Sequence, residues 1–172
     1  LMMSRSSNFS QLLTLIDLLL ADPVMTQKLI CLSQHTWDRV DAMTWAPSLL
    51  REPLPGSPER RLLTHMGVGD HAVPNLSSEL LAREVGAPLL GPSAHVPYGF
   101  EAQEGPLDSA FVTVDFGIMN LPGVEARLPD GEERNAVHDS LRDLDAIKAQ
   151  VDAFLRPGGQ VSNFCDGPCD PQ

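Results

Sequence analysis

Apolar residues recur along the first 50 residues at a spacing that predicts helices. The segment FSQLLTLIDLLLADP is expected to form one helix stopped by Pro23, and residues 25–46 a second helix stopped by Pro47. The Pro-rich segment REPLPGSPER, residues 51–60, is typical of a linker. We therefore expect a helical region over residues 1–50 that is separated by this linker from the rest of the chain.

The pattern changes after the linker. Residues 61–69, RLLTHMGVG, have the length and flanks of a buried strand, and residues 110–118, AFVTVDFGI, alternate in polarity and are rich in strand-forming residues. Between them Asn75 is a good N-cap for a short helix, LSSELLAREVG, which ends at Gly86. Residues 87–109 are expected to form a loop.

Two further features complete the pattern. In the helix after Asn75, Leu76, Leu80 and either Ala82 or Arg83 lie at helical spacing. After a long irregular segment over residues 119–135, a last helix is expected to end at the sequence RPGG. Its apolar stripe contains Leu144, Ile147, Val151, Phe154 and Leu155.

The order of these elements predicts the fold class. A helical region followed by strand, helix, strand and helix indicates an α/β protein with a parallel sheet and helices on its faces. Two strands are too few for a stable sheet of this kind. We therefore expect residues 61–160 to be the end of a larger sheet, followed by a Cys-containing tail over residues 161–172.

Charge and hydropathy exclude two classes of partner. The formal net charge of −11, from 23 acidic and 12 basic residues, repels phosphate backbones and argues against nucleic acid as a partner. The longest apolar stretch, residues 12–21, contains Asp17 and has about half of the roughly 20 residues that a transmembrane helix needs. We expect it to be a core or lid helix, with no transmembrane segment.

Three cysteines leave the cellular compartment open. Cys165 and Cys169 flank the turn sequence Asp-Gly-Pro, and they are expected either to close a small disulfide ring or to remain free thiols. Cys31 stands alone in a helical pattern. A disulfide would favour an extracytoplasmic location.

Two candidate chemical groups follow the predicted strands. Asp70 comes directly after the first strand, and His138 lies in the expected loop between the second strand and the last helix. Functional residues of open α/β sheets gather beyond the carboxyl ends of the strands. A carboxylate that binds one ring nitrogen of a histidine fixes its tautomer, which prepares the imidazole to act as a base.

These residues resemble the C-terminal portion of the α/β-hydrolase superfamily. In that family an acid follows the penultimate strand in a Gly-x-x-Asp-x-x-Val-Pro-like context, and a histidine follows the last strand. Gly67, Asp70, Val73 and Pro74 match the acid motif, and His138 matches the histidine position. The resemblance implies that Asp70 orients His138 and that His138 is the catalytic base.

The resemblance also implies what this chain lacks. The nucleophile elbow Gly-x-Ser-x-Gly is absent, and the nearest string, GPSAH at residues 91–95, lacks the second Gly and follows the acid instead of preceding it. The nucleophile and the oxyanion hole are therefore expected in an N-terminal half of the same hydrolase. By family analogy the substrate is a carboxylic ester or lipid, residues 1–50 form a lid, and no cofactor is implied.

Other interpretations of the same residues remain open. The chain can be a non-catalytic α/β interaction domain, in which Asp70 is a turn residue and His138 only a neighbour of the helix start. His71 is a rival base, although adjacent side chains on a turn usually diverge. A metal site is disfavoured because its possible ligands are scattered: His71, His95, His138, Cys165 and Cys169. Packing roles are expected for His35, His65, Trp37 and Trp45.

Overall fold

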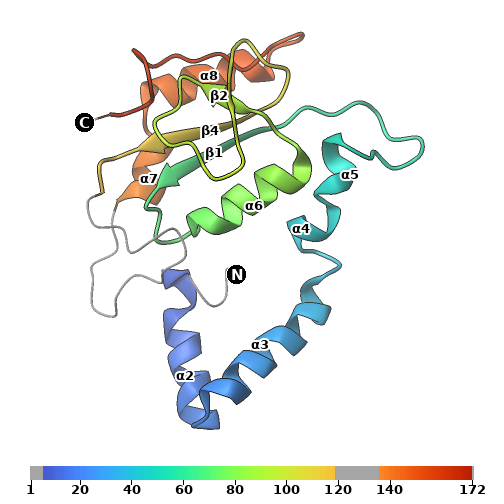
Figure 1. Ribbon diagram of the computed structural model, residues 1–172, viewed down its shortest axis with the longest axis vertical. Coiled ribbons are helices and arrows are strands. Elements are labelled where there is room, and N and C mark those ends of the chain that lie inside the picture. Colours follow the sequence, from blue (N-terminus) through green and yellow to red (C-terminus); the bar gives the residue numbers. More distant parts are fainter. Residues whose placement is uncertain (1–5, 119–135, 172) are drawn as a thin grey trace.

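The computed structural model describes residues 6–118 and 136–171 and contains one four-stranded sheet (Figure 1). The strand order is β1-β4-β2-β3, and every pairing is parallel. Helices α6 and α8 cover opposite faces of the sheet. Alternate residues of β4 point to opposite faces, and they accordingly pack into separate apolar clusters. Phe111 faces α6, whereas Val114 packs with Ile147 of α8. The predicted α/β class with a parallel sheet is confirmed.

The two predicted strands are neighbours in this sheet. They are β1, Leu63–Val68, and β4, Ala110–Asp115, which pair over their whole length. The loop expected between residues 87 and 109 was wrong in part, since it contains β2, Leu89–Gly91, and β3, Ala102–Glu104. Three-residue strands are too short to produce a periodic pattern. They are recognisable only from their pairing with each other and with β4.

The helical region contains several helices, and the predicted second helix is interrupted. Asp41 accepts a hydrogen bond from the Met43 backbone N–H at 2.9 Å and so starts a new helix, and that bond, with one from Gln34, lowers the pKa of Asp41. Pro47 begins a helix instead of stopping one, because a first helical residue needs no N–H donor. The helices before the sheet are η1 Ser7–Phe9, α2 Ser10–Leu20, α3 Pro23–Trp37, α4 Ala42–Trp45 and α5 Pro47–Leu50.

The helix that follows β1 is α6, Asn75–Val85, and its buried face agrees with the expected one only at Ala82. Ala82 and Val85 pack on the sheet, while Leu76 and Leu80 are only partly buried. The expected N-cap role of Asn75 was wrong, since Pro74 occupies that position and no side chain caps the helix. The Asn75 side chain has other partners, described below.

Two helices follow the residues that lie outside the description. They are α7, Val137–Leu141, and α8, Asp145–Leu155. In α8 Ile147 is buried as expected, but Leu155 is 72% exposed and Gln150 is buried in its stead. The Gln150 amide is satisfied by hydrogen bonds to His65 and to the Ser162 carbonyl, which permits its burial. The irregular segment expected over residues 119–135 lies outside the described residues.

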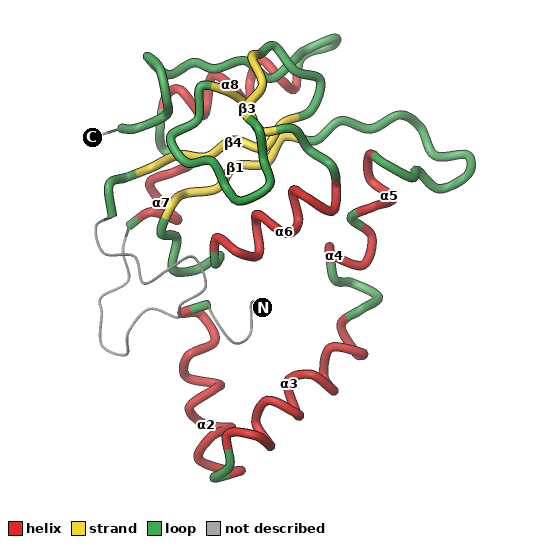
Figure 2. The backbone as a smooth tube through the Cα atoms, in the orientation of Figure 1, coloured by secondary structure: helices red, strands yellow, loops and turns green. Residues whose placement is uncertain are grey.

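Helices α2 and α3 form a hairpin that extends away from the sheet (Figure 2). Only Leu13 of α2 and Thr26 of α3 are buried, so the expectation of a core helix was wrong. The exposed large apolar side chains of the hairpin are Leu12, Leu15, Leu18, Leu19, Leu20, Val24, Met25, Leu29, Leu32 and Trp37. Trp45 is likewise half exposed. No helix in the described part of the chain is long and apolar enough to cross a membrane.

The C-terminal tail is tied to the sheet. Cys165 and Cys169 form a disulfide, whereas Cys31 is free and exposed. The Asp115 N–H at the end of β4 donates to the Cys169 carbonyl at 3.0 Å. Cys169 also packs in the apolar cluster with Val114, so the tail belongs to the folded unit.

Candidate active site

The site begins at the turn where the chain leaves β1. Gly69 has φ +82°, a left-handed conformation that favours glycine. Asn75 spans this turn: its Nδ2 donates to the Gly67 carbonyl at 2.7 Å, and its Oδ1 accepts from the Gly69 N–H at 2.8 Å. The strand end, the turn and the start of α6 therefore form one hydrogen-bonded unit.

Asp70 projects from this unit with a carboxylate that is only 6% exposed. Its Oδ1 accepts backbone N–H bonds from Ala72 at 2.7 Å and Val73 at 3.1 Å. These bonds form an Asx-type turn. One carboxylate oxygen is thus held by the backbone, which leaves Oδ2 for another partner.

That partner is His138. Its Nδ1 lies 2.8 Å from Asp70 Oδ2, although the two residues are 68 positions apart in the sequence. Because a carboxylate only accepts hydrogen bonds, the proton of this contact is on Nδ1. His138 lies in the short helix α7 and not in the expected loop. The expected contact between Asp70 and His138 is present.

A glycine allows α7 to reach this position. A Cβ added at Gly67 would overlap the Val137 side chain, which is 2% exposed and precedes His138. The strand and α7 therefore approach more closely than a larger residue would permit. Gly67 and Val137 set the distance between the elements that carry Asp70 and His138.

The second nitrogen of His138 is the chemically available one. The side chain is 42% exposed, and in residues 6–118 and 136–171 no side chain bonds Nε2. With Nδ1 protonated, Nε2 carries a lone pair that can take a proton from a hydroxyl. The pair thus has the orientation that a general base and its carboxylate require, and no serine or cysteine in the described part of the chain bonds Nε2.

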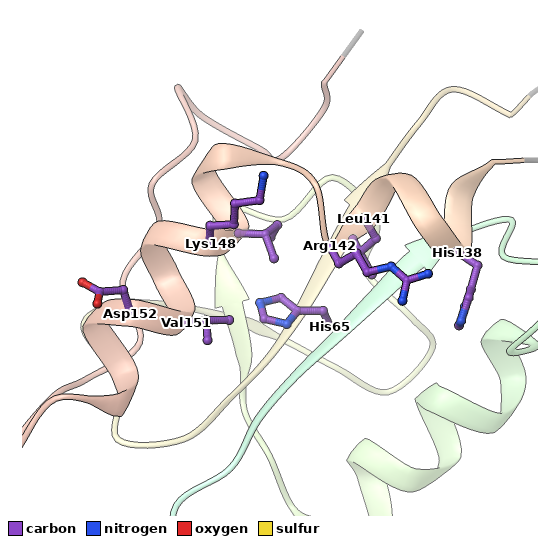
Figure 3. A pocket seen from close by; sticks show the side chains of 8 residues that line it. His65, His138, Leu141, Arg142, Lys148, Val151 and Asp152 are labelled. Carbon is purple, nitrogen blue, oxygen red and sulfur yellow. The ribbon is translucent and has the colours of Figure 1, made fainter.

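A groove adjoins His138 along β1 (Figure 3). It has a volume of about 440 Å³, within the range of ligand sites, and Leu141, Ile147 and Val151 supply its apolar lining. His65 also lines it. Burial lowers the pKa of His65, and the bond from its Nε2 to Gln150 at 2.7 Å only partly opposes this. His65 is therefore a neutral, anchored wall of the groove near pH 7.

The other histidines have different partners. The His71 Nδ1 bonds the Ser7 hydroxyl, and the His71 carbonyl accepts from the Ser7 N–H at 2.9 Å, so this side chain is used to fasten the N-terminal segment. His35 is exposed and pairs with Asp38, so its expected packing role was wrong. Trp37 is also exposed, with 55% of its surface accessible to solvent.

His95 forms a second carboxylate pair. Its Nε2 lies 3.5 Å from Glu79 Oε1, and both atoms are buried without a hydrogen-bond partner among the described residues. In that same part of the chain, no three His, Cys, Asp or Glu side chains are grouped so as to hold a metal ion. Cys165 and Cys169, two of the possible metal ligands, are joined to each other in a disulfide.

Sequence reasoning missed Asn75, Val137 and the Glu79–His95 pair. The Asn-after-Pro pattern resembles an ordinary helix cap, and an apolar residue beside a histidine carries no visible signal. Comparison with models of protein families, with curated proteins and with solved structures found no match to this chain.

Proposed function

We propose that this chain is the C-terminal portion of a serine hydrolase of the α/β-hydrolase type, in which Asp70 orients His138 and His138 is the general base. The observation that carries the proposal is the 2.8 Å contact between His138 Nδ1 and the buried Asp70 side chain, in a histidine whose side chain is 42% exposed. This arrangement fixes the tautomer that a base acting on a serine hydroxyl requires. The nucleophile and the oxyanion hole come from the N-terminal half of the same hydrolase.

The two edges of the sheet support a further strand beside β1. At the opposite edge, β3 is three residues long, exposed at every residue and charged at Glu104, which are features of a protected edge. In contrast β1 is six residues long, uncharged and buried at Met66, Gly67 and Val68. Parallel strands buried on both faces are typical of sheet interiors. The N-terminal half would therefore extend the sheet from β1.

The surroundings of His138 favour an ester or lipid as the substrate. The groove that His138 shares with Leu141 and Val151 is mostly apolar and suits an acyl chain. The exposed apolar side chains of the α2–α3 hairpin suit a lid over such a site. The serine would attack the ester carbonyl while His138 takes the serine proton and gives it to the leaving alcohol. Water, deprotonated by His138, would then attack the acyl-serine and release the carboxylic acid, which regenerates the serine hydroxyl.

The alternative is a non-catalytic α/β interaction domain. The observation in its favour is the α2–α3 hairpin, since exposed apolar surfaces of this size mark sites of association. In this alternative the Asp70–His138 pair only joins α7 to the turn after β1. The two functions differ in whether a serine hydroxyl becomes reactive in the presence of His138.

The decisive experiment compares this chain with its longer parent. On a short acyl ester the 172-residue chain should be inactive, because it has no activated hydroxyl, whereas the parent should be active and should be labelled at one serine by a fluorophosphonate. His138→Ala in the parent should abolish both signals. Activity of the 172-residue chain that is insensitive to His138→Ala would contradict the proposal, as would a parent with no reactive serine.

A further inference from the structure

We propose that Asn75 is a positioning residue, which aims the Asp70 carboxylate at His138 by closing the turn after β1. This inference rests on the proposed function, because it assigns a supporting group to the same pair. Asn75 is 9% exposed and bonds the backbone on both sides of Val68, at Gly67 O and Gly69 N. It touches neither Asp70 Oδ2 nor His138, so it acts through the backbone.

The position of Asn75 makes its choice of partners informative. It is the first residue of α6, one position after the N-cap residue Pro74. Here α6 has no side-chain cap, and the amide reaches back across the turn. The amide is therefore used to hold the turn.

Only an amide satisfies both contacts. The Gly67 carbonyl needs a donor and the Gly69 N–H needs an acceptor, and asparagine offers one of each from a single rigid group. The Gly67 carbonyl also accepts from the Asp70 N–H at 3.2 Å, so Asn75 and Asp70 share an acceptor. Any movement of Gly67 is thus transmitted directly to the backbone of Asp70.

The consequence concerns the direction of the carboxylate. Its Oδ1 is held by Ala72 and Val73 on one side of the turn, while Asn75 fixes the other side. With both sides fixed, Oδ2 points at His138 Nδ1. A displacement of about 1 Å in such a group costs on the order of a hundredfold in rate. Loss of the two Asn75 hydrogen bonds should therefore lower the population of the His138 tautomer that is protonated on Nδ1.

The experiment observes that tautomer directly in the 172-residue chain by ¹⁵N NMR of the histidine rings at a pH where they are neutral. In the wild type His138 should be protonated on Nδ1. In Asp70→Asn the amide offers a donor to Nδ1, so the proton should move to Nε2. Asn75→Ala, which removes both contacts, and Asn75→Asp, which keeps the acceptor but faces the Gly67 carbonyl with an oxygen, should each give a mixture of tautomers.

Gln150→Ala is the matched control. It also removes a buried amide with two hydrogen bonds, but these go to His65 and to Ser162 O, away from Asp70. It should leave the His138 tautomer unchanged. An equal effect from Gln150→Ala would overturn the positioning role and assign the change to general loss of core packing.

The remaining outcomes separate this inference from the proposed function. If Asp70→Asn moves the proton but neither Asn75 variant does, Asn75 has no positioning role and the Asp70–His138 pair stands. If Asp70→Asn itself has no effect, the pair and the proposed function both fail. Far-UV circular dichroism reports folding, and an unfolded Asn75→Ala leaves the decision to the nearly isosteric Asn75→Asp. Unfolding of both variants would make Asn75 a stability residue and overturn the inference.

Discussion

The Asp70–His138 pair and the Glu79–His95 pair differ in the distance between their side chains, in the exposure of the histidine and in the backbone around the carboxylate. The Asp70–His138 pair is short, at 2.8 Å, and its histidine is accessible. The Glu79–His95 pair is 3.5 Å long, and its two facing atoms form no hydrogen bond with the described residues. A short, aligned pair therefore needs more than the presence of the two residue types at the end of a sheet.

The backbone around each carboxylate accounts for the difference. Asp70 follows a turn that directs two N–H groups at one of its oxygens, so the other oxygen has a defined direction. Glu79 projects from within α6, where the backbone donors are already used by the helix. His95 is held through its backbone by the Thr113 hydroxyl, which accepts from N–H and donates to C=O. This second pair fastens the loop after β2 to α6.

The largest expected effect separates the two pairs by activity. In the proposed parent hydrolase, Asp70→Asn should lower kcat/KM by roughly four orders of magnitude, because the wrong histidine tautomer cannot act as the base. Glu79→Gln should leave the rate close to the wild-type value, since that pair has no part in the reaction. Steady-state kinetics on a short acyl ester measures both. A comparable loss in Glu79→Gln would remove the distinction between the pairs.

The close packing of α7 against β1 can be disrupted without a substitution in either pair. Gly67→Ala places a Cβ against Val137, and overpacking of this kind costs about 1 to 3 kcal/mol of folding free energy. It should also move His138 away from Asp70 and lower the activity of the parent. Gly91→Ala in β2 is the comparison variant, because its Cβ would meet the nearest atoms at 3.3 Å, a tight contact but less severe than the overlap with Val137, and it should therefore cost less. Urea unfolding that ranks the two variants equally would contradict this account of Gly67.

The tail disulfide tests whether loss of global stability alone disturbs the first pair. A serine double variant at Cys165 and Cys169 opens a small ring, which should cost about 2 kcal/mol in urea unfolding. The His138 tautomer should not change, because the ring contacts the end of β4 and not the turn after β1. Thiol titration of the denatured, unreduced wild type should detect only Cys31. Detection of three thiols would show that the ring is open.

The smallest effect concerns His65, whose partner is an amide and not a carboxylate. Burial lowers the pKa of His65 below its usual 6.5, so the unfolded chain binds a proton there more readily than the folded chain. The stability that the neutral, buried ring contributes is complete above pH 6.5 and is lost as the pH falls below it. His65→Gln should flatten this part of the pH profile of urea unfolding. His35→Gln, at an exposed position, should leave it unchanged, and an equal flattening would contradict the assignment.

Several elements were predictable because their signals are local. The strand over residues 61–69 is a mostly apolar run and that over residues 110–118 alternates in polarity, and their parallel pairing follows from the helix between them. Gly86 ends α6 with φ +80°, as a glycine at that position predicts. In contrast, β2 and β3 are defined only by their backbone pairing, which no local pattern reveals. The exposure of Leu18 and Leu19 likewise depends on which other elements pack against the α2–α3 hairpin.

The sequence by itself determined that an acidic residue and a histidine follow two strands of a parallel sheet, because strand patterns and Gly-rich turns are properties of neighbouring residues. Tertiary structure alone decided that these side chains meet. Their contact joins residues 68 positions apart. It depends on the space beside Gly67 that the Val137 side chain fills, and on the hydrogen bonds by which Asn75 closes the turn after β1. Each of these depends on the distance between elements that are far apart in the chain, and no local pattern of residues encodes that distance.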